Sequence, residues 1–112
     1  LYTQLVYWVA DEAPADWRTV RINMEMLLEN GEVANSWATY CKVGDDMQDV
    51  EMEASAVKEI ELRNLFRALN DLSAESGDRW TVCDFTVNST GQYNVDYSYD
   101  PPPRLSGDLR AY

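Results

Sequence analysis

Hydrophobic and polar residues alternate along this chain with two different periods, one typical of strands and one typical of helices. Between Val20 and Leu28, hydrophobic residues occupy every second position, which predicts a strand with one face on the core. Asn30-Gly31 comes next, and this pair tolerates the positive φ angles of a tight hairpin. The run from Val33 to Cys41 is therefore expected to return antiparallel. The larger side chains of that run, which we expect on the core, are Val33, Asn35, Trp37, Thr39 and Cys41.

Three further runs alternate in the same way. Met47 to Glu53 predicts a short third strand, while Trp80 to Val87 and Gln92 to Tyr99 predict a second hairpin. Three prolines at 101–103 end the last strand, because proline has no amide hydrogen for a sheet ladder. The tail that follows, residues 104–112, is expected to be irregular.

Two segments have helical spacing instead. Residues 1–12 carry hydrophobic side chains three and four positions apart, and Pro14 forbids continuation of that helix. Ser55 is a suitable N-cap for a second helix reaching about Glu75. Its apolar stripe consists of Leu62, Leu65, Phe66, Leu69 and Leu72. The sequence thus predicts one α+β domain over residues 1–112, with an antiparallel sheet of four to five strands packed against two helices.

The charge balance narrows the choice of partners. Twenty Asp and Glu face nine Lys and Arg in 112 residues, for a formal net charge of −11. Such a surface repels nucleic acid and anionic membranes and attracts basic proteins, so we expect a protein partner and neither of the other two. The sequence contains no long apolar run of the kind that spans a membrane and no recognisable signal peptide, so we expect a cytoplasmic protein.

The residue types that most enzymes rely on are scarce. The chain has no histidine, its glycines are scattered singly, and its two cysteines do not form a Cys-x-x-Cys pair. We therefore expect no metal, no cofactor and no catalysis, although twenty acids leave a carboxylate-based enzyme as an alternative. Cys41 and Cys83 fall in predicted strands and are interpreted as reduced and structural, with a single cross-strand disulfide left open.

Two features are candidates for partner binding. The densest acidic stretch runs from Asp45 to Glu61, and a row of tyrosines lies on one face of the last strand. The bland interpretation is a solvated strand edge for the acids and core packing for the tyrosines. Carboxylates and tyrosines are also what an interface with a basic protein would use. The residues that we predict to bind the partner are Asp45, Asp46, Asp49, Glu51, Glu53, Tyr97, Tyr99 and Asp100.

The C-terminal hairpin resembles that of a known family. The run from Trp80 to Val87, followed by Gly-x-Tyr-x-Val-Asp-Tyr-x-Tyr-Asp over residues 91–100, is similar to the closing hairpin of YezG-type bacterial immunity proteins. The earlier order also matches: Trp17 opens a strand, Asn30-Gly31-Glu32 makes a turn, and a helix spans Leu62 to Leu72. The resemblance implies an antitoxin that binds a bacterial toxin, often a nuclease, and it supplies no catalytic residues.

Three functions remain in competition at this point. The first is an immunity protein that blocks the active surface of a basic toxin domain by binding it. The second is an acidic adaptor or assembly subunit in another pathway, whose partner has no toxic activity. The third is a small enzyme with paired carboxylates, which would need a deep pocket and a carboxyl group with a strongly shifted pKa. The sequence leaves the oligomeric state open under all three.

Overall fold

The computed structural model describes residues 1–107, which form five strands and three helices. In chain order, these elements are α1 (Tyr2–Glu12), β1 (Trp17–Glu29), β2 (Glu32–Val43), β3 (Gln48–Val50), α2 (Ala56–Glu75), β4 (Val82–Asn88), β5 (Tyr93–Ser98) and α3 (Pro103–Ser106).

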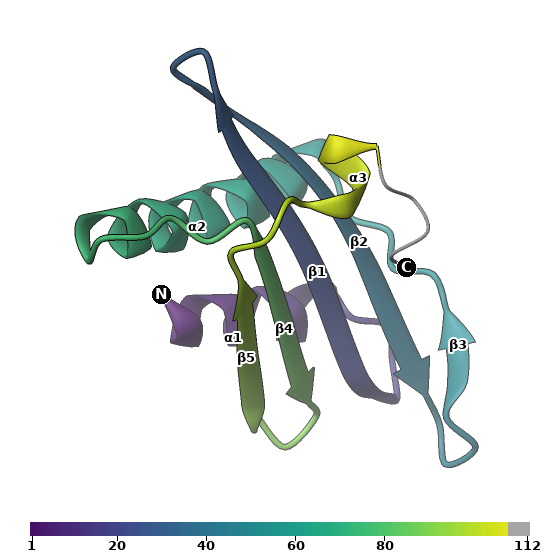
Figure 1. Cartoon of the computed structure of the whole chain (residues 1–112). Helices are drawn as coiled ribbons and strands as arrows, with labels where there is room; N and C mark the ends of the chain where they lie inside the picture. Colours follow the sequence, from purple (N-terminus) through teal and green to yellow (C-terminus); the bar gives the residue numbers. More distant parts are fainter. Residues whose placement is uncertain (108–112) are drawn as a thin grey trace.

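The strands form one sheet in the order β3-β2-β1-β4-β5, and every neighbouring pair is antiparallel. Helices α1 and α2 lie behind this sheet in Figure 1, and the short α3 lies in front of it, over β1 and β2. The predicted α+β class, with an antiparallel sheet of four to five strands, is therefore confirmed. We call the side under α1 and α2 the helix face of the sheet and the other side the open face.

The β1–β2 hairpin is the longest feature of the sheet and projects beyond the rest of the molecule (Figure 1). Glu29 pairs with Glu32, so the turn consists of Asn30 and Gly31 alone. Their φ angles of 53° and 79° are both positive, as a type I′ hairpin turn requires. The hairpin predicted from Asn30-Gly31 is confirmed.

The hydrophobic core fills the space between the helix face and the two helices. It buries Val20, Ile22, Met24 and Met26 of β1 and alternate residues of β4, with Leu62, Phe66 and Leu69 from α2. The face of β2 expected on the core does lie there, since its Cys41 is buried opposite Val20. The last members of the two predicted apolar rows, Leu28 on β1 and Leu72 on α2, are each 51% exposed.

The two cysteines are free and buried. Cys41 pairs with Val20 and Cys83 with Met24, from opposite sides of β1. With one strand between them and four residues of offset, they are too far apart for a disulfide, which decides the alternative that the sequence left open. Burial raises the pKa of the Cys83 thiol to about 12, so it stays protonated and unreactive.

Ser55 caps α2 as predicted, accepting a hydrogen bond from the Lys58 amide at 3.2 Å. Two local departures from the expected elements have physical causes. Strand β3 is shorter than the predicted run, because it pairs with β2 over three residues only. The tail was expected to be irregular, but Pro103 opens the single turn of α3, where the fixed φ of proline suits a first helical position. No helix among residues 1–107 combines the length and hydrophobicity that crossing a bilayer requires.

Candidate functional site

The residues predicted to bind a partner fall into two groups at opposite edges of the sheet. One group lies on β3 and on the segments that flank it, at one edge of the sheet. The other group lies on β5 and just after it, at the opposite edge, and strands β2, β1 and β4 separate the two. The first group is Asp45, Asp46, Asp49, Glu51 and Glu53, and the second is Tyr97, Tyr99 and Asp100. The two groups therefore do not form one continuous surface.

The first group, which we call the acidic edge, is exposed to solvent throughout. Arg18 approaches Asp45 at 2.7 Å, and Lys42 approaches Asp49 at 2.8 Å. The Asp45 side chain is 97% exposed, so its ion pair contributes little to stability. Met47, which is 42% exposed, lies between these acids, so the acidic edge adds a negative field with little apolar contact surface.

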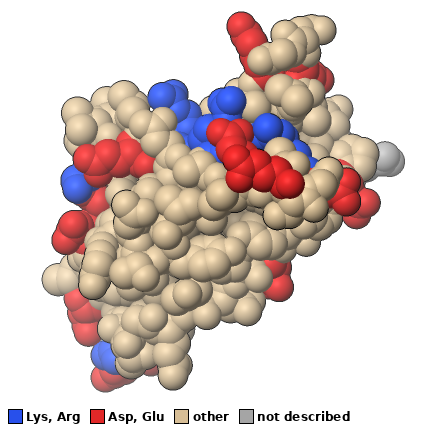
Figure 2. All heavy atoms as spheres, turned by 90° about the vertical axis from the view of Figure 1, so that its left-hand side faces the viewer, with Lys and Arg blue, Asp and Glu red and all other residues tan. Residues whose placement is uncertain are grey.

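The second group borders a groove between the start of α1, the C-terminal half of α2 and strand β5. The groove has a volume of about 560 Å³, and we call it the aromatic groove. Figure 2 shows a broad area without charged side chains on this side of the molecule, with charged groups above it and at its margins. The residues that line the groove are Leu1, Tyr2, Leu69, Leu72, Ser73, Ser76, Asp78, Trp80, Tyr97 and Tyr99.

Strand alternation explains why tyrosines reach this groove. Tyr97 pairs with the buried Cys83, so it points to the helix face, where its ring meets that of Trp80 at 5.8 Å. The Tyr97 hydroxyl is hydrogen-bonded to the hydroxyl of Tyr2, which joins β5 to α1. Burial, with a smaller contribution from that hydrogen bond, raises the pKa of Tyr97, so the phenol stays neutral.

Trp80 forms the buried floor of the groove, with 0% of its surface exposed. Two polar side chains of α2 hold its backbone: Asn70 donates to the Trp80 carbonyl at 2.7 Å, and the Trp80 amide donates to the Ser73 hydroxyl at 3.1 Å. The indole N–H of Trp80, however, has no acceptor among the described residues. A buried donor without a partner is rare in folded proteins and calls for an explanation.

One acidic side chain lines the groove, and charged side chains beside it form ion pairs. Asp78 is the only Asp, Glu, Lys or Arg among the described residues that line it. Nearby on α2, Asp71 receives hydrogen bonds from Arg79 at 2.8 Å and Arg67 at 3.2 Å. The Arg79 hydrogen bond is the largest cause that lowers the pKa of Asp71, which therefore stays ionised and cannot act as a general acid near neutral pH.

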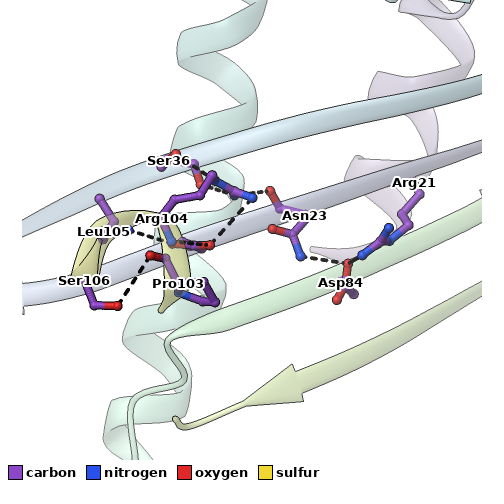
Figure 3. Close-up of polar contacts among 9 residues, drawn as sticks. Arg21, Asn23, Ser36, Asp84, Pro103, Arg104, Leu105 and Ser106 are labelled. Carbon is purple, nitrogen blue, oxygen red and sulfur yellow. Dashed lines mark hydrogen bonds and ion pairs between the residues drawn. The ribbon is translucent and has the colours of Figure 1, made fainter. Parts of the chain in front are cut away.

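The open face has a different organisation, centred on a buried carboxylate (Figure 3). Glu25 is 0% exposed, and its carboxylate accepts hydrogen bonds from the amides of Arg104 at 3.2 Å and Leu105 at 3.0 Å. The Arg104 guanidinium lies 3.6 Å from that carboxylate and donates to the hydroxyl and carbonyl of Ser36. These contacts fix α3 on the sheet.

A second set of polar contacts continues across the open face (Figure 3). Asp84 accepts from Asn23 at 3.0 Å and from Arg21 at 2.9 Å, and the Arg21 guanidinium lies over the Tyr40 ring. The charged groups Arg21 and Asp84 thus pair with each other across the sheet. Asn23 and Glu25 lie on the face of β1 that alternation turns away from the core. Both are nevertheless buried, because neighbouring strands and α3 cover them.

Sequence reasoning singled out Tyr97 and Tyr99 but missed Tyr2 and the other residues that line the groove. Leu72 and Trp80 could have been predicted from the sequence. Leu72 continues the apolar stripe of α2 past the buried residues, and Trp80 follows soon after Gly77, where the helix has ended. Asp78 carried none, because one acid among twenty is unremarkable. Among residues 1–107, no group of three or more Cys, Asp or Glu side chains is arranged to hold a metal ion.

Comparisons with known proteins identify the family of the chain. A search of curated proteins gives no match to the chain. A family model described as "Immunity protein YezG-like" matches residues 1–103, which include the acidic edge, the aromatic groove and the whole sheet. The chain belongs to the YezG-like immunity protein family.

Proposed function

We propose that this chain is an antitoxin that neutralises a cognate bacterial toxin domain by binding it and covering its active surface, without catalysis of its own. The observation that carries the proposal is the match to an immunity protein family over residues 1–103. The acidic composition and the lack of histidine support it, because neither is typical of an enzyme that works by general acid–base chemistry.

The partner that we propose is a basic domain of the kind that a nuclease presents to its substrate. A net charge of −11 gives a long-range attraction for such a surface and repels nucleic acid. Carboxylates of the inhibitor would then occupy positions that phosphates take in the toxin's substrate complex. We place the encounter in the cytoplasm, where two free cysteines fit a reducing environment.

The two edges would have different roles in this complex. The acidic edge, with Asp45, Asp46, Asp49, Glu51 and Glu53, would mainly accelerate association, since exposed charges set on-rates more than affinities. The opposite edge, with Tyr97, Tyr99 and Asp100, would supply the desolvated contacts that hold the toxin. This division of roles is a prediction.

The test is a direct one and starts from the gene next to the one that encodes this chain. Its toxin domain, expressed alone in a bacterial host, should arrest growth, and co-expression with this chain should restore it. The purified proteins should form a tight one-to-one complex whose association rate falls steeply as salt is added. If the toxin domain neither forms a complex nor loses its activity, the proposal is wrong.

The second candidate, an acidic adaptor, gives a different result in the same assay. It predicts a partner whose expression is harmless, so co-expression would leave growth unchanged. The carboxylate enzyme finds less support, because the groove has a single acidic side chain among the described residues that line it.

A further inference from the structure

We propose that the aromatic groove binds a segment of the basic toxin domain that presents an Arg or Lys side chain. This inference rests on the proposed function and adds the place and the chemistry of the contact. Two properties of the groove support it: its exposed aromatic walls and its single negative charge.

The walls have the composition of an affinity-determining surface. Tyr99 is 58% exposed and Leu72 51% exposed, on opposite sides of the groove, yet both border the fully buried Trp80. Tyrosine supplies a large contact area at low cost in conformational entropy, and its ring face attracts guanidinium and ammonium groups. Such side chains around a buried floor are typical of residues whose truncation weakens binding most.

The charge of the groove selects a cationic occupant. Asp78 lines it, and no Lys or Arg does so among the described residues. A cation entering between the tyrosine rings would meet this carboxylate, whereas an acidic segment would meet repulsion. A second copy of this chain is disfavoured for the same reason, because two molecules of charge −11 repel each other.

The floor of the groove is closed to a partner. Trp80 is 0% exposed, and its indole N–H is buried with it. The occupant therefore contacts the exposed walls and Asp78.

The test compares two groove variants with two matched variants on the open face, all measured against the toxin domain from the neighbouring gene. Tyr99→Ala should weaken the affinity about tenfold or more, and Asp78→Asn about threefold to tenfold with a reduced salt dependence. The controls are Tyr40→Ala and Asp96→Asn, an exposed tyrosine and an exposed aspartate outside the groove. Both should bind within about twofold of the unchanged protein.

The outcomes separate the two proposals. If the unchanged chain forms no complex, both the proposed function and the groove inference are overturned. A tight complex whose affinity is unchanged in both groove variants overturns the groove inference alone. Loss of binding in Tyr40→Ala or Asp96→Asn, with Tyr99→Ala unaffected, would place the toxin on the open face and would also reject the groove.

Discussion

The β3 edge and the β5 edge of the sheet both carry residues predicted to bind a partner, but they are built in opposite ways. At β3, the short strand and the segments on either side of it carry exposed carboxylates, of which Asp45 and Asp49 form ion pairs with Arg18 and Lys42. At β5, tyrosines stand on a floor formed by the buried Trp80. The comparison teaches that charge and contact surface are separated in this molecule, so long-range attraction and tight binding are open to separate mutation.

The largest effect should come from removing the floor of the aromatic groove. Trp80→Ala leaves a cavity under Tyr97 and should lower the free energy of unfolding by about 3–5 kcal/mol. Denaturant unfolding followed by circular dichroism measures this change. Asp49→Ala at the acidic edge is the control and should change it by less than about 0.5 kcal/mol. Similar values for the two variants would mean that the edges are not built differently.

A smaller loss should follow from releasing the floor from α2. Asn70 is buried, its amide donates to the Trp80 carbonyl, and its side-chain oxygen accepts from Arg79. Asn70→Ala leaves a buried carbonyl unpaired and should cost about 1–3 kcal/mol in the same unfolding experiment. Asn64→Ala, an exposed asparagine on the same helix, should be close to neutral. A neutral Asn70→Ala would show that packing alone positions Trp80.

The acidic edge should act on rate, with little effect on stability. Reversing Asp49 and Glu51 to Lys should slow toxin association by about tenfold at low salt, because steering depends on exposed charge. Stopped-flow mixing at several salt concentrations measures this, and unfolding should be nearly unchanged because both side chains are exposed. Reversing Glu29 and Glu32 at the hairpin tip is the control of equal charge. An equal loss from both pairs would mean that only net charge matters.

The smallest effect concerns pH and the arginines beside the groove. The pKa of Asp71 lies below its ordinary value of 3.8 in the folded chain, first because of the hydrogen bond from Arg79. A depressed pKa adds stability that is present above about pH 4 and is lost as pH falls through the folded-state value. The unfolding difference between the unchanged chain and Arg79→Gln should therefore shrink below pH 4. This pH-dependent part should be small, since Asp71 is half exposed, whereas the loss of the Arg79 hydrogen bond to the buried Asn70 side chain should not depend on pH.

The control for that titration is Arg63→Gln, an exposed arginine on the same helix for which the described structure shows no ion pair. Its unfolding difference should show no comparable change below pH 4. If Arg79→Gln and Arg63→Gln behave alike across the titration, the Arg79–Asp71 contact does not explain the pH dependence.

Local patterns predicted most of the fold, because each depends on residues close in the chain. Asn30-Gly31 specified its turn, Ser55 its helix start, and the period of two selected the buried face of β2. The burial of Glu25 escaped prediction, since it depends on Arg104, 79 positions later. Nor does any local pattern state that β4 lies beside β1, which is what places the two predicted binding groups on opposite edges. The unpartnered Trp80 N–H likewise depends on the assembled core.

The most direct test of the account is a comparison of toxin association and dissociation rates for Tyr99→Ala and for the Asp49→Lys, Glu51→Lys pair. The account predicts that Tyr99→Ala accelerates dissociation with little change in association, and that the charge-reversed pair does the opposite. Faster dissociation of the charge-reversed pair, with Tyr99→Ala indistinguishable from the unchanged chain, would contradict the account, because the acidic edge would then be the contact surface.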